Sequence, residues 1–190
     1  KYENGSVPQI KSGVTDFDSD LEDTSAMVID HYKELMNELH FSDALSEVWK
    51  LVAQSNKYID QTEPWKLAKD PDDKEKLDSV MAHLAASLRV IAELISPVMT
   101  HAPKEIFNQL GLTDEIDLKN LDFMKLPAGS QTVKKGTPIF PRVDADEEVD
   151  FIKQQMTKTD KTKGRSAMKA AAENQFNPEE TDLNLTKKEV

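Results

Sequence analysis

The sequence predicts an all-α protein, an antiparallel helical bundle followed by an irregular C-terminal extension. Apolar residues recur at steps of three and four over three long stretches before Pro97, which is the spacing of one helix face. Only short breaks separate these stretches, and short connections favour antiparallel neighbours. After Leu112 the periodicity weakens and Pro and Gly become frequent, so the bundle is expected to end there.

The first two helices follow from apolar stripes and N-cap signals. The first is expected from about Asp20 to His40, opened by the capping-box spacing of Ser19 and Glu22. The second is expected to begin after Ser42, a natural N-cap, and to run to about Asp60. Trp49 lies on the flank of the second helix and is interpreted as a core residue.

Three prolines and a glycine delimit the later helices. Pro64 is suited to restart a short helical turn, because its missing N–H is not needed at a first position. Asp70 and Pro71 are expected to open the longest helix, as N-cap and first residue. Pro97 should end that helix, and Gly111 should stop a shorter one that follows.

We therefore expect three regions: a bundle over residues 1–112, a loop with a closing helix over 113–156, and a flexible linker or tail over 157–190. The closing helix should span roughly Ala145 to Met156, and it is expected to pack on something outside this chain. The basic stretch from Lys158 to Arg165 is interpreted as solvated linker or, alternatively, as a phosphate contact. Because the first residue is Lys1 and not Met, we expect the chain to be cut from a longer protein.

Composition narrows the classes of function. The net charge of −11 over 190 residues argues against broad, phosphate-driven nucleic-acid binding, and we expect no DNA partner. The absence of cysteine excludes disulfides and thiolate zinc sites. No apolar run is long enough to cross a bilayer, so we expect no membrane partner. The lack of cysteine fits a reducing compartment, and we expect a cytoplasmic protein.

Motifs for catalysis are missing. None of the four histidines has a carboxylate three residues earlier, as a bundle di-iron site requires; these are His31, His40, His83 and His101. The sequence also lacks His-Glu-x-x-His and a Gly-rich loop ending in Gly-Lys. We expect no catalytic residue and no metal, and we interpret Arg89 as an interhelix salt bridge or a snorkelling side chain.

The most informative feature is the predicted corner at Pro64. Pro64 fixes the approach to Trp65, and a rigidly held indole at a corner is a good platform for an unpaired base. Spacing alone leaves open that Trp65 merely caps the bundle core. It also leaves open that Asn56 and Tyr58 are satisfied buried polar groups.

The residues around this corner resemble a known family. The run Tyr58-Ile59-Asp60-x-x-x-Pro64-Trp65-x-Leu67-Ala68-Lys69-Asp70 is similar to the anticodon-binding domain of bacterial methionyl-tRNA synthetases. Later pieces match the family in the right order; they are Leu88-Arg89, Pro97-Val98-Met99, Ile106-Phe107-x-x-Leu110-Gly111 and Gly136-x-Pro138-Ile139-Phe140-Pro141-Arg142. The resemblance covers about Lys1 to Met156.

The resemblance implies a function and a site. In that family the bundle reads the CAU anticodon of methionine tRNA, and a separate catalytic domain joins methionine to the tRNA with ATP. It implies that Trp65 stacks on an anticodon base, supported by Asn56, Lys57, Tyr58 and Pro64. It further implies that an Asn and an Arg on the helix before Lys1 also read the anticodon. No cofactor is expected in this chain; ATP belongs to the catalytic domain of the parent protein.

Two other classes of function remain open on the residues. One is an acidic helical bundle for structure or protein interaction, without RNA binding. The other is an enzyme in its own right, a helical lyase or a metalloprotein.

Overall fold

The computed structural model describes residues 5–112, 117–141, 144–146 and 148–156. These residues fall into two compact units, Lys1–Ile139 and Phe140–Val190. The first unit extends past residue 112, where the sequence suggested that the bundle ends. It does so because Leu121, Phe123 and Leu126 are buried in the bundle core. A fully buried side chain of this size contributes about 1.5–3 kcal/mol, which holds the loop on the helices.

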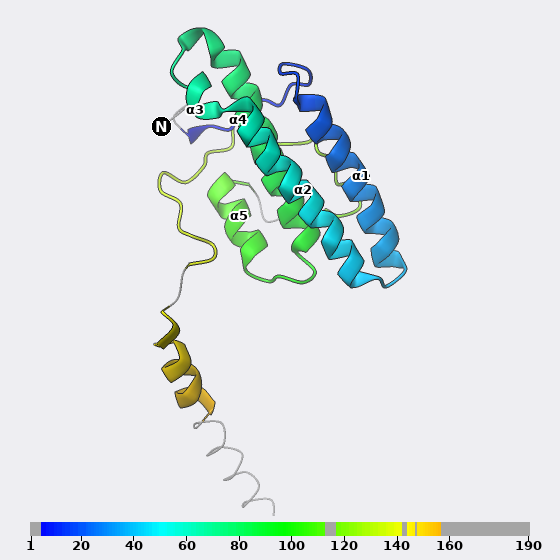
Figure 1. Cartoon of the computed structure of the whole chain (residues 1–190), viewed down its shortest axis with the longest axis vertical. Helices are drawn as coiled ribbons and strands as arrows, with labels where there is room; N and C mark the ends of the chain where they lie inside the picture. The colour runs from blue at the N-terminus through cyan, green and yellow to red at the C-terminus, as the bar shows by residue number, and fades with distance from the viewer. Residues whose placement is uncertain (1–4, 113–116, 142–143, 147, 157–190) are drawn as a thin grey trace, which may run out of the picture. The chain divides into compact units, whose positions relative to one another are not determined.

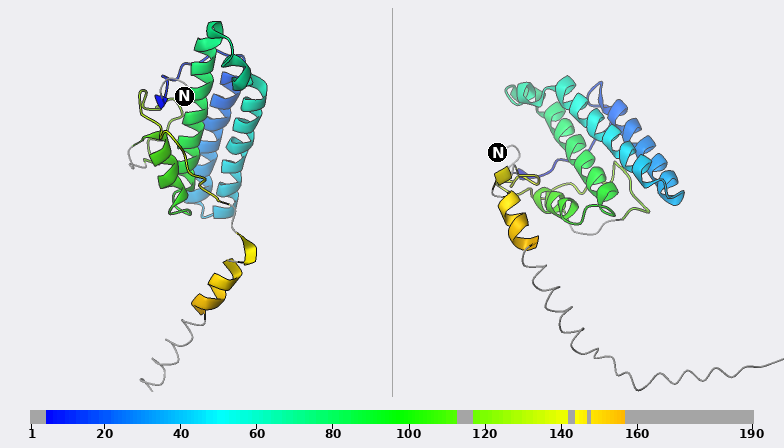
Figure 2. Two further views of the ribbon diagram at one scale, coloured as in Figure 1. Left: turned by 90° about the vertical axis from the view of Figure 1, so that its left-hand side faces the viewer. Right: turned by 60° about the horizontal axis from the view of Figure 1, so that its bottom comes forward.

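Three long helices lie side by side and form the body of the first unit (Figures 1 and 2). They are α1 (Asp18–Asn37), α2 (Phe41–Thr62) and α4 (Lys74–Ile95). A single turn, α3 (Pro64–Leu67), and a 3₁₀ turn, η2 (Pro71–Asp73), connect α2 to α4. The short helix α5 (Ala102–Leu110) packs against α4. The predicted all-helical architecture is confirmed, and within the described residues the only β-type pairing is an isolated bridge between Ser6 and Gln131.

The helix ends show which local signals were correct. The capping box was wrong, because α1 begins at Asp18 and so contains Ser19 in its first turn. Ser42 is likewise not a cap, since α2 already begins at Phe41. Asp70 is a cap, because its side chain accepts the backbone N–H of Asp72 at 3.0 Å, but it caps the 3₁₀ turn η2, and the longest helix, α4, begins only at Lys74. Gly111 adopts a φ of +67° directly after α5, as expected for a helix stop.

Two expectations about individual side chains on the long helices need correction. Trp49 was expected in the core but is 56% exposed, because it lies on the outward face of α2. Arg89 is buried and forms its salt bridge within α4, at 2.6 Å from Glu93, and not between helices. Its second guanidinium nitrogen donates to the carbonyl of Asp122 in the covering loop.

The second unit contains the expected closing helix, with helical backbone at residues 145–146 and 148–156. Its apolar residues Val149, Ile152 and Met156 are all exposed. The predicted tail over 157–190, with its basic stretch, lies outside the described residues. In the described parts of both units, no helix combines the length and apolar character needed to span a membrane.

Candidate nucleic-acid interface

The chain turns sharply where α2 meets α3. Glu63 adopts the left-handed conformation, with φ 44° and ψ 59°, which is uncommon for a residue with a side chain. Its backbone N–H donates to the carbonyl of Ile59 at 3.0 Å. The hydroxyl of Thr62 donates to the carbonyl of Tyr58 at 2.7 Å. Pro64 then occupies the first position of α3, so the direction of the next residue is fixed by backbone geometry.

Trp65 is the residue that this turn presents. Its side chain lies on the surface, with 51% of the residue exposed, and it is not part of the buried core. Among the described residues no other ring stacks on its indole. An exposed aromatic side chain on a fixed backbone can stack on an unpaired base without first losing much conformational freedom.

The other predicted site residues do not all reach the surface. Asn56 and Lys57 are exposed on the last turns of α2, and Pro64 is partly covered. Tyr58 is fully buried, and its hydroxyl donates to Oδ1 of Asp18 at 2.6 Å. A direct contact between the Tyr58 side chain and RNA is therefore a wrong expectation. The alternative, a satisfied buried polar group, describes Tyr58 correctly.

Asp18 anchors the base of the corner. Its carboxylate accepts the backbone N–H groups of Val14 and Thr15, both at 2.9 Å, and the hydroxyls of Thr15 and Tyr58. Burial opposes its ionisation, but these hydrogen bonds outweigh burial and lower the pKa of Asp18. Burial and the adjacent Asp18 carboxylate raise the pKa of Tyr58, so its hydroxyl stays a donor. Sequence reasoning missed Asp18; an acidic residue at the first helical position, three residues after Thr15, was the available signal.

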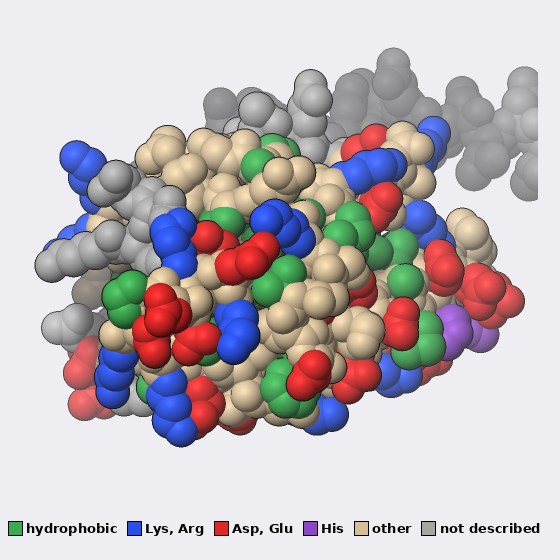
Figure 3. Space-filling view, turned by 90° about the horizontal axis from the view of Figure 1, so that it is seen from above, with side chains coloured by type: hydrophobic (Ala, Val, Ile, Leu, Met, Phe, Trp, Pro, Cys, Tyr) green, Lys and Arg blue, Asp and Glu red, His purple; other side chains and the backbone are tan. Residues whose placement is uncertain are grey.

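Charge around the corner is balanced. Lys66 pairs with Glu63 at 2.6 Å, and Lys76 pairs with Asp73 at 3.0 Å. Lys57 makes no ion pair in the part of the chain that the structure describes. Figure 3 shows acidic and basic side chains interspersed on the face seen from above. Without a broad basic field, affinity for RNA at this face has to come from stacking and a few local contacts.

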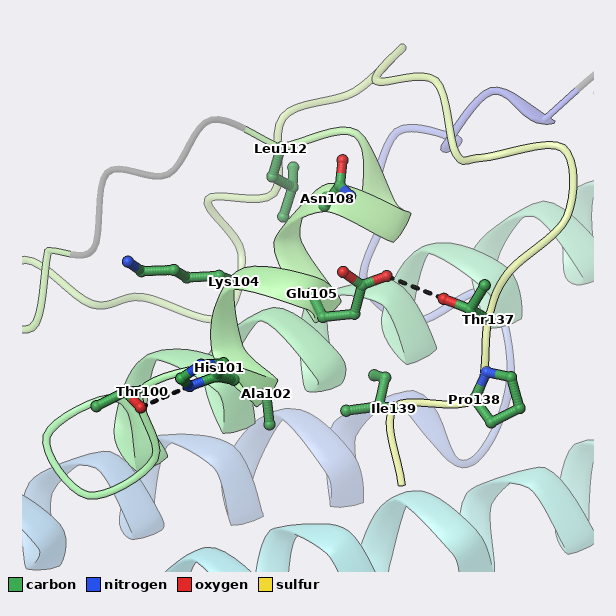
Figure 4. A pocket seen from close by; sticks show the side chains of 10 residues that line it. All are labelled: Thr100, His101, Ala102, Lys104, Glu105, Asn108, Leu112, Thr137, Pro138 and Ile139. Carbon is green, nitrogen blue, oxygen red and sulfur yellow. Dashed lines mark hydrogen bonds between the residues drawn. The ribbon is translucent and has the colours of Figure 1, made fainter. Parts of the chain in front are cut away.

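A wide groove of the first unit lies elsewhere, between α5 and residues 137–139, with a volume of about 1020 Å³ (Figure 4). Glu105 accepts hydrogen bonds there from Thr137 at 3.2 Å and from Gln109 at 3.0 Å. At one end of the groove the Thr100 hydroxyl lies 2.7 Å from Nδ1 of the adjacent His101, and both side chains are exposed to solvent. Within the described ranges, no three His, Cys, Asp or Glu side chains are grouped so that they could hold a metal ion.

The same helical fold occurs as one part of larger solved proteins. Methionyl-tRNA synthetase from Mycobacterium tuberculosis in its free state matches with a TM-score of 0.68 and 24% identity, over 76% of this chain and 29% of that one. The same enzyme bound by methionyl-adenylate gives a TM-score of 0.67, over 74% of this chain and 28% of that one.

Sequence relationships are closer. The model of the anticodon binding domain of methionyl tRNA ligase matches residues 7–160, and the chain belongs to this family. It is 62% identical to methionine–tRNA ligase from Lactiplantibacillus plantarum, over 98% of this chain and 29% of that ligase. It is 44% identical to the ligase from Enterococcus faecalis, over 98% of this chain and 27% of that ligase. The chain thus spans less than a third of the length of these relatives.

Proposed function

We propose that this chain is the anticodon-reading part of a ligase that uses ATP to join methionine to its tRNA. The observation that carries the proposal is the exposed indole of Trp65 on a fixed corner, in a chain of this family. An unstacked base of the anticodon loop of methionine tRNA lies flat on the indole. Such a stack is worth about 1–3 kcal/mol per base.

Neighbouring groups assist this stack in different ways. Asn56 offers an exposed amide for hydrogen bonds, and Lys57 offers an ammonium group for a phosphate. Pro64 holds the backbone at the corner. Tyr58 acts from beneath, because its bond to Asp18 ties the last turn of α2 to the start of α1. It is a positioning residue and makes no contact with RNA.

The chemistry belongs to the remainder of the ligase. The chain spans under a third of the length of its relatives, and ATP and methionine bind in a separate catalytic domain of the ligase. The exposed apolar stripe of the closing helix, Val149, Ile152 and Met156, is a surface that can contact that domain. Anticodon docking then orients the tRNA so that its acceptor end reaches the distant site. A ligase that charges tRNA works where translation occurs, in the cytoplasm.

The test is Trp65→Ala in the full-length ligase, with Trp49→Ala as the matched control. Both indoles are about equally exposed, but Trp49 lies away from the corner on α2. Loss of a 1–3 kcal/mol stack predicts a fall in kcat/KM for tRNA of roughly 5- to 150-fold for Trp65→Ala. Trp49→Ala and methionine activation without tRNA should be unaffected. An unchanged kcat/KM in a folded Trp65→Ala enzyme would favour a bundle that binds a protein partner and no RNA.

A further inference from the structure

A buried histidine lies close to the anchor of the corner. His83 of α4 is fully buried between α1 and α2. Its Nδ1 lies 2.8 Å from the backbone carbonyl oxygen of Ser79, and its Nε2 lies 2.8 Å from Oε1 of Glu22 on α1. Its ring centroid lies 5.9 Å from that of Tyr58. His83 therefore links the helix that carries Asp18 to the helix that carries Tyr58.

The hydrogen-bond partners of His83 define its protonation. A carbonyl oxygen can only accept, so the short contact with Ser79 requires a proton on Nδ1. An ionised carboxylate also only accepts, so the contact with Glu22 requires a proton on Nε2. A neutral imidazole has one N–H and cannot serve both partners. We infer that His83 is an imidazolium ion in the folded protein, and that it positions the Trp65 corner as the counter-ion of Glu22 and Asp18.

The charges that face His83 support this assignment. From α1, Glu22 and Asp18 present two carboxylates; the second oxygen of Glu22 accepts the Ser12 hydroxyl at 2.5 Å. On α2, the titratable group that faces His83 is Tyr58. In the covering loop, the ring centroid of Phe123 lies 5.8 Å from that of His83. Asp122 and Lys125 line the groove that reaches Glu22, with Asp23 and Asp30.

The two carboxylates have no salt-bridge partner other than His83 among the described residues. Within the described residues, neither Glu22 nor Asp18 pairs with a lysine or arginine within 4.0 Å. A buried carboxylate without a counter-charge is costly, so the imidazolium stabilises the place where α1, α2 and α4 meet.

Tyr58 connects His83 to the corner that carries Trp65. Tyr58 contacts the imidazole with its ring and Asp18 with its hydroxyl, and its carbonyl accepts the hydroxyl of Thr62 next to the corner. Loss of the charge on His83 would loosen this joint and with it the direction of Trp65. This step rests on the proposed function, whereas the charge on His83 does not.

The first experiment measures the protons directly. NMR of the 190-residue chain labelled with ¹⁵N-histidine at pH 8 should show hydrogens on both ring nitrogens of His83. The exposed His31, His40 and His101 serve as internal references, and His83→Gln assigns the signal. A single hydrogen, on Nδ1 only, would mean that the shared proton resides on Glu22 or is absent, and would overturn the inference.

The second experiment uses linkage. Histidine in an unfolded chain is half-protonated near pH 6.5, about the value of a free side chain, so unfolding above that pH releases the proton of His83. The unfolding equilibrium constant should therefore rise about tenfold per pH unit above roughly pH 7. Glu22→Gln should abolish this slope. His31→Gln is the matched control. His31 lies on α1, as Glu22 does, and contacts a carboxylate, Glu47, at 3.8 Å, but its side chain is exposed. The His31→Gln variant should keep the pH slope. A slope in Glu22→Gln equal to that of the wild type would contradict the inference.

The third measurement separates this inference from the proposed function. In the full-length ligase, Glu22→Gln should weaken binding of an anticodon stem-loop several-fold at pH 8, and should add nothing in a Trp65→Ala background. If Trp65→Ala weakens binding and Glu22→Gln does not, His83 does not position the corner. If Trp65→Ala leaves binding unchanged, the proposed function fails, while the NMR and pH results still decide the charge on His83.

Discussion

Gly111 packs directly on the backbone of Gln131. A Cβ atom placed on Gly111 would lie 2.1 Å from the carbonyl oxygen of Gln131, far inside contact distance. The returning loop is also joined to α5 by the Val133 N–H, which donates to the carbonyl of Gln109 at 3.0 Å. Gly111 thus has two roles, since it ends α5 with a positive φ and lets the loop close on the helix.

Gly111→Ala should therefore destabilise the fold more than a matched glycine substitution. Gly13 has a similar φ of +71° but open space around it, so Gly13→Ala should cost only the strain of the left-handed backbone, about 1–2 kcal/mol. Gly111→Ala adds a collision with rigid backbone and should cost more. Urea unfolding of both variants gives the comparison, and equal losses would contradict the close approach.

Tyr58→Phe tests the anchor beneath the corner. The variant removes a hydrogen bond to a buried carboxylate, so we expect a loss of about 1.5–3 kcal/mol in the free energy of unfolding. Tyr32→Phe is the control, because the Tyr32 hydroxyl donates to the neutral carbonyl of Leu94 at 2.6 Å and should cost about 0.5–1.5 kcal/mol. Denaturant titrations at pH 7 measure both. A smaller loss for Tyr58 than for Tyr32 would refute the charged anchor.

Asp18 should make stability fall in acid. Its pKa is lower in the folded protein than in the unfolded chain, where an aspartate titrates near pH 3.9, so the unfolded state binds more protons in this window. The stabilisation is complete above about pH 5 and is lost as the pH falls through the folded pKa. Asp18→Asn should flatten this limb of the stability profile. Asp20→Asn, an exposed carboxyl in the same turn, should leave it unchanged.

The buried pair of Arg89 and Glu93 should show strong coupling. Burial raises the pKa of Glu93, and the Arg89 guanidinium opposes that rise. Arg89→Met would leave the carboxyl buried and unpaired, at an expected cost of about 3–5 kcal/mol. The double variant Arg89→Met/Glu93→Leu should be less destabilised than Arg89→Met alone. A double-mutant cycle measured by urea unfolding decides this, and additive losses would show that the two side chains act independently.

The helices could be predicted from the sequence because each repeats an apolar face. The three long helices and α5 were located within a few residues, and Pro64, Asp70 and Gly111 marked real ends. The first caps were misplaced because Ser19 and Ser42 fit a local pattern, while the start of α1 is set by the bonds of Asp18 to a preceding turn. The bundle boundary was placed early because a loop without periodicity gives no sign that Leu121 and Phe123 are buried.

The candidate site remains a prediction, and the structure shows only where its residues lie. Trp65 and Pro64 were chosen from the corner, and the structure places the indole on the surface where stacking is possible. Trp49 was assigned to the core but is exposed, whereas Tyr58, a proposed RNA contact for which a buried position was left open, is buried. On a helix, one residue step turns the side chain by about 100°, so a small error in the position of the buried face exchanges core and surface for flanking residues.

The amino-acid order alone determined the helical elements, the corner and the family resemblance, because periodicity, proline and short motifs act over a few neighbouring residues. Tertiary packing decided which side of each helix is buried, which polar groups meet there, and that the buried His83, Asp18 and Tyr58 form one cluster with the partly exposed Glu22. These residues are distant along the chain, and only the packing of three helices brings them within hydrogen-bond or ring-contact distance. Their charges and hydrogen bonds have meaning only in that shared, water-excluded space.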